Sequence, residues 1–272
     1  MKTIVTPTDF SSSSINAVHY AADLAVSLGA ELILLNVVQL PITVSDVPMT
    51  ESVFEELIDS AREEMDDLEK ELASRTAGKI KITKELVAGT VENQLEEICH
   101  AKNPFAVVMG MKEGADAGRF LLGSNALYAV KHLRFPVLVV PEHSTFRGIR
   151  HMGLACDLQD VAKSIPFSLM EEWLEAFKAR LDIIHVCNSA DAKELQNGKD
   201  ALYVRERFSN FQPQLHFLPK QQVEKGLDEF SRQHQVDLLM VVPKKHDIWE
   251  WFDRKHSKGI ILHTHIPVLS MR

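Results

Sequence analysis

The first half of the chain alternates between short apolar runs and longer stretches in which apolar residues recur every three or four positions. The runs are typical of strands that are buried on both faces, and the recurring pattern is typical of amphipathic helices. Strands that alternate with helices predict right-handed crossovers and a parallel sheet covered on both faces. We expect strands over residues 3–6, 31–38, 80–87, 107–109 and 137–140, and helices over residues 15–28, 51–74, 91–98 and directly after residue 125.

The second half repeats landmarks of the first half in the same order. The segment ARLDIIHVCN at residues 179–188 matches AELILLNVVQ at residues 30–39, and HTHIPVL at residues 263–269 matches HLRFPVL at residues 132–138. Colinear landmarks of this kind indicate two copies of one domain. The polar stretch over residues 142–150 is typical of a linker between them.

The patterns therefore predict an α/β protein with two tandem, open, five-stranded parallel sheets that carry helices on both faces, a Rossmann-like arrangement. We place one domain at residues 1–144 and the other at residues 145–272. The second domain is shorter in the middle, where only residues 199–211 stand in the place of the long helix predicted at residues 51–74.

Composition narrows the class of protein. The 272 residues are 45% hydrophobic and 25% charged, which is typical of a soluble globular protein. The net charge of −8 and the pI near 5.8 argue against a general nucleic-acid binder, which would carry a basic face. We find no apolar stretch of the roughly 20 residues that span a membrane, no signal peptide, and three cysteines that form no disulfide framework. We expect a cytoplasmic protein with neither a membrane nor a nucleic-acid partner.

A loop of glycines and small residues lies between a strand and a helix within residues 107–141, VVMGMKEGADAGRFLLGSNALYAVKHLRFPVLVVP. The apolar run ends in Gly110, and the loop closes on Gly123-Ser124-Asn125, where the next helix begins. A glycine loop at a strand end brings backbone N–H groups close to a ligand, and a helix N-terminus favours an anion. The alternatives are an ordinary surface loop and, for Ser124, an N-cap of the helix.

This stretch resembles the nucleotide loop of universal stress proteins, which have the pattern Gly-x2-Gly-x9-Gly-Ser followed by a helix and a strand that begins Pro-Val-Leu-Val-Val. Gly110 and Gly123-Ser124 keep the outer spacing of the pattern, but the slot of the middle glycine holds Glu113, and Gly114 lies one place later. A glutamate side chain in this slot would repel a triphosphate, whereas a slip of one residue to Gly114 could be absorbed by the loop. Together with the repeat, the resemblance covers nearly the whole chain as a tandem pair and implies the adenine nucleotide alpha hydrolase-like fold.

A ligand site is expected where the strands of the first domain end, because parallel sheets bind ligands beyond their carboxyl ends, where the strand order switches. Asp9, with the Thr8 hydroxyl beside it, could hydrogen-bond a ribose or an adenine edge, and Val38 would offer backbone groups and an apolar wall to a base. The alternative for Asp9 is a cap of the serine-rich start of the next helix. The resemblance supports these roles, and the candidate site residues are Pro7, Thr8, Asp9, Val38, Gly89, Gly110, Gly114, Gly123, Ser124 and Asn125.

The second domain departs from this pattern at the loop. At the positions that match the glycines of the first domain it carries Gln221, Val242, Arg254 and Lys255. We therefore expect it to have kept the fold and lost the nucleotide loop. Residues 237–246 resemble the second domains of some bacterial tandem members of the family.

Two other features of the second domain have rival interpretations. Cys156, His185 and Cys187 fall at strand ends and could converge as soft-metal ligands, but such residues are more often packed in a core, and no tight ligand spacing supports a metal site. The aromatic and basic segment over residues 249–265 could form a partner surface or an anion site, or it could cover the edge of the sheet. We expect no metal beyond a Mg²⁺ ion that accompanies the nucleotide.

No set of residues in the first domain forms a recognised catalytic motif: there is no Gly-x4-Gly-Lys-Ser/Thr, no Gly-x-Ser-x-Gly and no His-Glu-x-x-His. The resemblance thus implies a stress-response protein that is not an enzyme, binds ATP or ADP in its first domain, and pairs its last strands, residues 137–140 and 268–271, in an intramolecular pseudo-dimer. Slow hydrolysis of bound ATP and a homodimer stay open. The rival hypothesis is a non-nucleotide module of the same fold that binds a protein partner, which Glu113 favours. An adenine-using enzyme of the electron-transfer flavoprotein type is a third alternative, but the sequence offers no reactive group for it.

Overall fold

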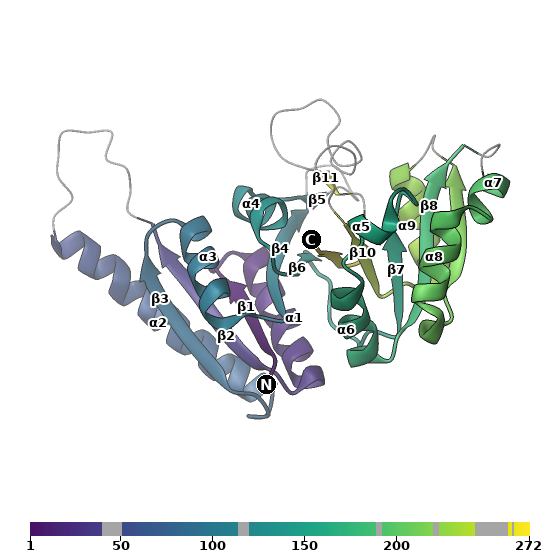
Figure 1. Ribbon diagram of the computed structural model, residues 1–272. Helices are drawn as coiled ribbons and strands as arrows, with labels where there is room; N and C mark the ends of the chain where they lie inside the picture. Colours follow the sequence, from purple (N-terminus) through teal and green to yellow (C-terminus); the bar gives the residue numbers. More distant parts are fainter. Residues whose placement is uncertain (40–50, 114–119, 189–191, 220–222, 243–260, 263) are drawn as a thin grey trace, which may run out of the picture.

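The computed structural model describes residues 1–39, 51–113, 120–188, 192–219, 223–242, 261–262 and 264–272. Figure 1 shows two α/β halves side by side, the first in purple to teal and the second in green to yellow. The predicted α/β class is confirmed, because strands alternate with helices along both halves.

The elements of the first half follow the predicted order. Two details differ: the fourth strand continues past Gly110 to Glu113, and a short additional strand, Phe120–Leu121, precedes the last helix. The elements are β1 (Thr3–Pro7), α1 (Ser12–Leu28), β2 (Glu31–Val38), α2 (Glu51–Arg75), β3 (Ile82–Ala88), α3 (Val91–Lys102), β4 (Ala106–Glu113), β5 (Phe120–Leu121), α4 (Ser124–His132) and β6 (Val137–Pro141).

The second half has the same alternation with shorter helices. The helix predicted over residues 199–211 is α8 followed by a 3₁₀ turn. The elements are β7 (His151–Ala155), α5 (Val161–Ser164), α6 (Phe167–Phe177), β8 (Arg180–Cys187), α7 (Ala192–Gln196), α8 (Lys199–Arg207), η1 (Ser209–Phe211), β9 (Gln214–Pro219), α9 (Val223–His234), β10 (Leu238–Val241), β11 (Ile261–Leu262) and β12 (Val268–Ser270).

The strands form one continuous sheet in the order β3-β2-β1-β4-β6-β12-β10-β7-β8-β9. The strands of this order are parallel within each half, whereas β5 lies outside it and pairs antiparallel with β4. The halves join where β12 pairs antiparallel with β6, with Val268 opposite Val139 and Ser270 opposite Val137. The expected contact between the last strands is therefore found, and it fuses the two predicted five-stranded sheets edge to edge. The order reverses between β1 and β4 in the first half and between β7 and β10 in the second.

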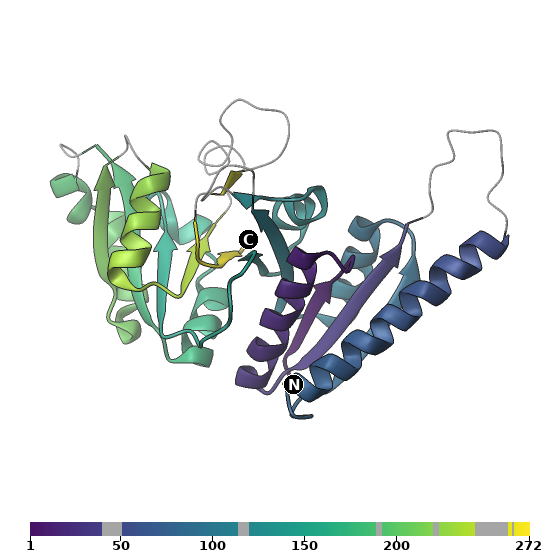
Figure 2. The same ribbon diagram turned by 180° about the vertical axis from the view of Figure 1, so that it is seen from behind.

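Alternate side chains of the strands face opposite helix layers. In the first half, Ile4 and Leu34 pack with α1 and α2, whereas Ile33 and Leu35 pack with α3 and α4. Figure 1 shows α3 and α4 in front of this sheet, and Figure 2, from behind, shows α1 and α2. This placement of helices on both faces buries most side chains of β1, β2 and β6. It confirms that the continuous apolar runs mark central strands.

The two halves share a core. One cluster of buried residues contains side chains of both, and the rings of Phe105 and Trp173 stack across the junction with centroids 4.6 Å apart. Lys2 Nζ lies 2.8 Å from Glu172 Oε1 on the same side. Within the described ranges, no helix is long and apolar enough to cross a membrane.

Candidate functional site

The end of β1 is held by hydrogen bonds around Thr8 and Asp9. The Thr8 N–H donates to the carbonyl O of Leu35 at 2.9 Å, and the Phe10 N–H donates to the Thr8 hydroxyl at 3.0 Å. Asp9 Oδ1 accepts from the N–H of Ser11 at 3.1 Å and from its hydroxyl at 2.6 Å. Ser11, and not Asp9, is the N-cap of α1. The alternative that Asp9 caps the helix directly is therefore wrong, because Asp9 instead orients the residue that does.

The surroundings of Asp9 keep its carboxylate ionised. Partial burial raises the pKa of Asp9, but hydrogen bonds from the Ser11 and Ser14 hydroxyls and from backbone N–H groups together outweigh burial and hold the pKa below its usual value. The side chain is exposed next to the point where the strand order reverses. An ionised, positioned carboxylate at this point can accept hydrogen bonds from ligand hydroxyl or amino groups.

The ends of β2 and β3 lie beside the end of β1. Asn36 Nδ2 donates to the carbonyl O of Thr8 at 2.9 Å, and the Gly89 N–H donates to the carbonyl O of Val38 at 3.2 Å. Gly89 has a φ of 140°, a conformation that side chains rarely adopt. The structure thus brings five predicted site residues to one edge of the sheet: Pro7, Thr8, Asp9, Val38 and Gly89.

Gly110 does not begin a loop, contrary to the sequence-based prediction. It lies inside β4, opposite Val140 of β6. A Cβ atom at Gly110 would lie 2.2 Å from the carbonyl O of Ser13, so glycine is required for the first turn of α1 to approach the strand. The sequence pattern could not separate this packing role from a phosphate-binding role, because both need a residue without a side chain.

Among the described residues, the start of α4 has open space at its N-cap and no side-chain cap. Gly123 is the N-cap, has no side chain to cap the helix, and would meet no atom within 4 Å if it carried a Cβ. Ser124 is the first residue of the helix, so the alternative that it is the N-cap is wrong. The helix is joined to the end of β4 through β5, since Leu121 pairs with Lys112. Gly123, Ser124 and Asn125 therefore present a helix N-terminus that can accept an anion.

Glu142 is a residue of this edge that the sequence placed in the linker. Its Oε1 accepts from the Ser12 hydroxyl at 2.8 Å, and its Oε2 accepts from the Glu113 N–H at 3.0 Å. These two bonds hold the pKa of Glu142 below its usual value. A carboxylate is favourable at the N-terminus of α1, so this helix end already has an anion of the protein. No sequence signal pointed to Glu142, because the contact depends on where β6 ends relative to α1.

Several predicted residues lie outside the described residues, and their placement stays a prediction. These are Gly114 in the first half, Gln221, Arg254 and Lys255 in the second, and nearly all of the aromatic and basic segment over residues 249–265. Val242, which matches Gly110, follows β10 and is buried.

The hydrogen bonds at the end of β1 recur at the end of β7. The Cys156 N–H donates to the carbonyl O of Ile184 at 3.0 Å, the Leu158 N–H donates to Cys156 Sγ at 3.3 Å, and the Gln159 N–H donates to Asp157 Oδ1 at 3.1 Å. Thr8, Phe10, Ser11 and Asp9 make the corresponding bonds in the first half.

His185 occupies the role that Asn36 has in the first half. Its Nδ1 lies 2.8 Å from the carbonyl O of Cys156, as Asn36 Nδ2 lies 2.9 Å from that of Thr8. Cys156, His185 and Cys187 are all buried, and among the described residues they form no group with the geometry of metal ligands. The interpretation of these residues as packed strand ends is therefore the better one.

Comparisons with known proteins agree with this fold. The model of the universal stress protein family matches residues 1–141. A curated universal stress protein of Methanocaldococcus jannaschii is 31% identical over 140 residues, which cover 51% of this chain and 81% of that protein.

Two solved structures are similar over the whole length. A universal stress protein of Archaeoglobus fulgidus superposes with a TM-score of 0.70 at 18% identity and covers 99% of this chain and 98% of its own. A putative universal stress protein of Pseudomonas aeruginosa gives a TM-score of 0.53 at 10% identity and covers 100% of this chain and 93% of its own. At these identities the two structures show the fold alone. The match over residues 1–141 shows more: this chain belongs to the universal stress protein family.

Proposed function

We propose that the first half binds an adenine nucleotide, ATP or ADP, at the carboxyl edge of its sheet. The nucleoside lies against the ends of β1, β2 and β3, where Asp9 accepts from the ribose and Val38 and Gly89 contact the base. The phosphates lie at the N-terminus of α4, against Gly123, Ser124 and Asn125. The observation that carries this proposal is the start of α4, where the N-cap glycine leaves space and no side chain caps the helix.

The two helix ends at this edge differ in their capacity for an anion. At α1, the Ser11 and Ser12 hydroxyls already donate to Asp9 and Glu142. At α4, the N-cap is a glycine, and no side-chain cap hydrogen bond is found there among the described residues. A phosphate is therefore directed to α4, where it gains charge-assisted hydrogen bonds without displacing a carboxylate.

The second half, residues 145–272, is proposed to be a structural or regulatory copy of the first, residues 1–144, packed against it as a pseudo-dimer. Two observations support this assignment. The hydrogen bonds at the end of β1 recur at the end of β7, and the strand order reverses within the second half as it does within the first. We propose binding without fast turnover, in a cytoplasmic protein. The three cysteines are buried and form no disulfide, which fits a reducing compartment.

The test is calorimetric titration of ATP into the nucleotide-free protein, with mass spectrometry of any small molecule released from the protein as purified. We expect about one nucleotide per chain. Gly123→Glu should weaken ATP binding by about 100-fold or more, because the added carboxylate repels the phosphates and the phosphates lose charge-assisted hydrogen bonds. The fold tolerates the side chain, since nothing lies within 4 Å of the added Cβ. Ser74→Glu, an equal change of charge at the exposed end of α2, should bind as the wild type does.

The rival function is a non-nucleotide module that binds a protein partner through the same loops. Glu113 favours it, since it holds the middle-glycine slot of the loop pattern with an acidic side chain. Absence of binding heat and of any released nucleotide would select this rival. Normal ATP binding by Gly123→Glu would instead reject the assignment of the phosphates to α4.

A further inference from the structure

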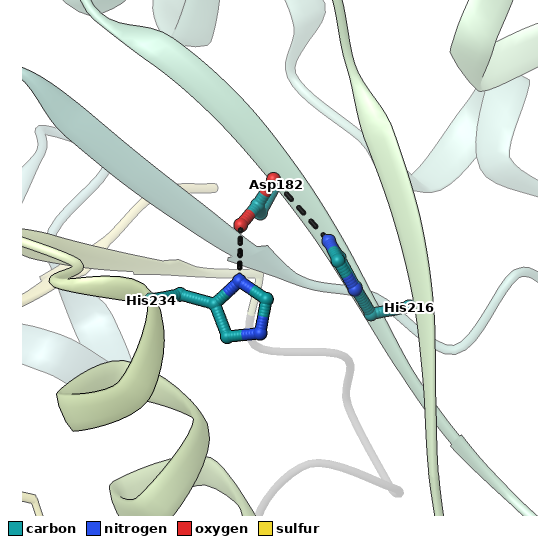
Figure 3. Close-up of side chains that lie close together, drawn as sticks. All are labelled: Asp182, His216 and His234. Carbon is teal, nitrogen blue, oxygen red and sulfur yellow. Dashed lines mark ion pairs between the residues drawn. The ribbon is translucent and has the colours of Figure 1, made fainter.

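A carboxylate and two imidazoles converge in the second half, near the amino ends of two of its strands. Asp182 lies near the amino end of β8, His216 near the amino end of β9, and His234 is the last residue of α9. Figure 3 shows the two rings turned toward the carboxylate from different elements. One ligand atom from each residue can be chosen so that all three lie within 4.8 Å of one another.

The register of the strands puts these groups on one face of the sheet. Asp182 pairs with Gly153 on one side and with Gln214 on the other, so His216, two residues after Gln214, projects on the same side as Asp182. This is the face that α9 covers, because Phe230 of α9 packs on Ile184, two residues after Asp182. The last residue of α9 is thereby brought over the carboxylate.

The first half has an apolar residue where Asp182 stands. Ile33 pairs with Val5 as Asp182 pairs with Gly153, and Ile33 is 1% exposed in the core under α3 and α4. Asp182 is 4% exposed. A buried carboxylate in place of an aliphatic side chain is costly unless a cation or a set of donors compensates it. The fold does not need this carboxylate, so its surroundings must explain it.

The distances from the Asp182 carboxylate to the two imidazoles are close to those between ligands of one tetrahedral ion. Asp182 Oδ1 lies 3.3 Å from His216 Nε2, and Asp182 Oδ2 lies 3.6 Å from His234 Nδ1. Ligand atoms bound to zinc at about 2.0–2.1 Å are separated by about 3.3 Å in a tetrahedral site. Imidazole nitrogens with a carboxylate oxygen are a donor set that zinc and similar divalent transition metals accept.

The imidazole nitrogens next to Asp182 are not satisfied by hydrogen bonds to it. His216 Nε2 and His151 Nε2 are buried and have no hydrogen-bond partner among the described residues, although each is within ion-pair distance of the carboxylate. His151 is 3% exposed, and its Nε2 lies 3.0 Å from Asp182 Oδ2. Arg180 also lies beside the cluster, with its guanidinium nitrogen 2.9 Å from His151 Nδ1. A bound cation or a ring N–H turned toward the carboxylate can each compensate Asp182, and the experiment below separates these two arrangements.

His151 also connects two of the ligands. Its Nδ1 lies 2.8 Å from the backbone carbonyl O of His234, while its Nε2 contacts Asp182. Metal sites commonly have such an outer residue, which fixes the orientation of the ligands. Exposure is graded across the cluster, with side chains 6% exposed at Asp182, 23% at His216 and 37% at His234, so an ion has a path from solvent.

We propose that Asp182, His216 and His234 bind a divalent transition-metal ion of the zinc class, with His151 as the positioning residue and water in the remaining coordination position. The ion joins β8, β9 and the end of α9. This site is independent of the proposed nucleotide site, because it lies in the other half and shares no residue with that site.

The experiment is a calorimetric titration of Zn²⁺ into chelator-treated full-length protein, repeated with Co²⁺ to read the coordination from its visible absorption. We expect one ion per chain at this site. His216→Gln and His234→Gln should each weaken this binding by about 100-fold or more and abolish the cobalt spectrum, and His151→Gln should weaken it by about 10- to 100-fold. His132→Gln, which removes an exposed imidazole from the first half, is the matched control and should change nothing.

A cluster that only neutralises Asp182 with protonated histidines gives a different result. In that case the wild type binds no Zn²⁺ at this stoichiometry, or His216→Gln and His234→Gln bind it as the wild type does, and either outcome overturns the proposal. Circular dichroism of each variant without metal shows whether it is folded. If a variant is unfolded, the wild type alone tests the proposal. The thermal midpoint of the wild type must rise with Zn²⁺, and an unchanged midpoint overturns the proposal as well.

Discussion

At the scale of single residues, the two halves use different side chains for the same bonds. Thr8, after β1, and Asn36, in β2, correspond to Cys156, after β7, and His185, in β8. The backbone geometry is kept, with φ values of 59° at Phe10 and 50° at Leu158. Sequence alone made Cys156 and His185 candidate metal ligands because it shows residue types and not their partners. It missed Asp182, since one acidic residue in an apolar run gives no spacing to interpret.

The two glycines that define the loop pattern should respond differently to alanine. Gly110→Ala should destabilise the protein by about 1–3 kcal/mol, because its Cβ would overlap the backbone of Ser13 and push α1 away from β4. Gly123→Ala should change the stability by less than about 1 kcal/mol, since its Cβ meets nothing within 4 Å. Urea unfolding followed by circular dichroism measures both. Equal effects would contradict the packing role of Gly110.

Glu142 should contribute stability that depends on pH. Its pKa in the folded protein lies below the ordinary value of 4.5, so the stabilisation is fully present above pH 4.5 and is lost as the pH falls through the lower folded pKa. Glu142→Gln should therefore lower the thermal midpoint at pH 7, and the difference from the wild type should shrink below pH 4.5. Glu64→Gln, on an exposed part of α2, serves as the control. A difference that stays constant with pH would show that the bonds to Ser12 and Glu113 do not depend on the charge.

At the scale of elements, the sequence predicts those helix and strand bounds that depend on the local pattern of residues. Helix α1 ends at Gly29, which adopts a φ of 60° and caps the helix as the pattern indicates, and β2 has the predicted bounds. The extension of β4 to Glu113 and the existence of β5 were missed, because they depend on pairing with partners far along the chain: β5 pairs with β4 and with β11. Strands of two residues have no periodicity to detect.

A hydrogen bond joins the ends of neighbouring strands in each half. It can be tested by giving the second half the residue that makes this bond in the first half. His185→Asn should retain most of the stability, because an asparagine makes the same bond to the preceding strand in the first half. His185→Ala should cost about 1–3 kcal/mol, since it leaves the buried carbonyl O of Cys156 without this partner. The measurement is the urea midpoint of the three proteins. If His185→Asn is no more stable than His185→Ala, the two strand ends are not equivalent.

At the scale of the whole molecule, the antiparallel pair of β6 and β12 makes one sheet from two parallel ones and removes an exposed edge from each half. Leu269 of β12 is opposite Leu138 of β6, and neither is exposed to solvent. The shared core continues through Phe105 and Trp173. Because the sheet and the core both cross the junction, the two halves should unfold together.

This cooperative unfolding depends on the contacts between the two halves, and a substitution at the junction should remove it. In a background with Trp249→Phe and Trp251→Phe, Trp173 is the single tryptophan and reports on the second half and the junction. Its fluorescence and the far-UV circular dichroism should change at the same urea concentration.

Leu269→Asp buries an unpaired carboxylate between the halves, which costs several kcal/mol. The fluorescence transition should then precede part of the circular dichroism change, as the second half unfolds before the first. Arg272→Asp, an exposed position beyond the same strand, should leave the two signals coincident. Coincident transitions in Leu269→Asp would mean that neither half is stable without the other, and separate transitions in the unaltered junction would mean that the continuous sheet does not couple them.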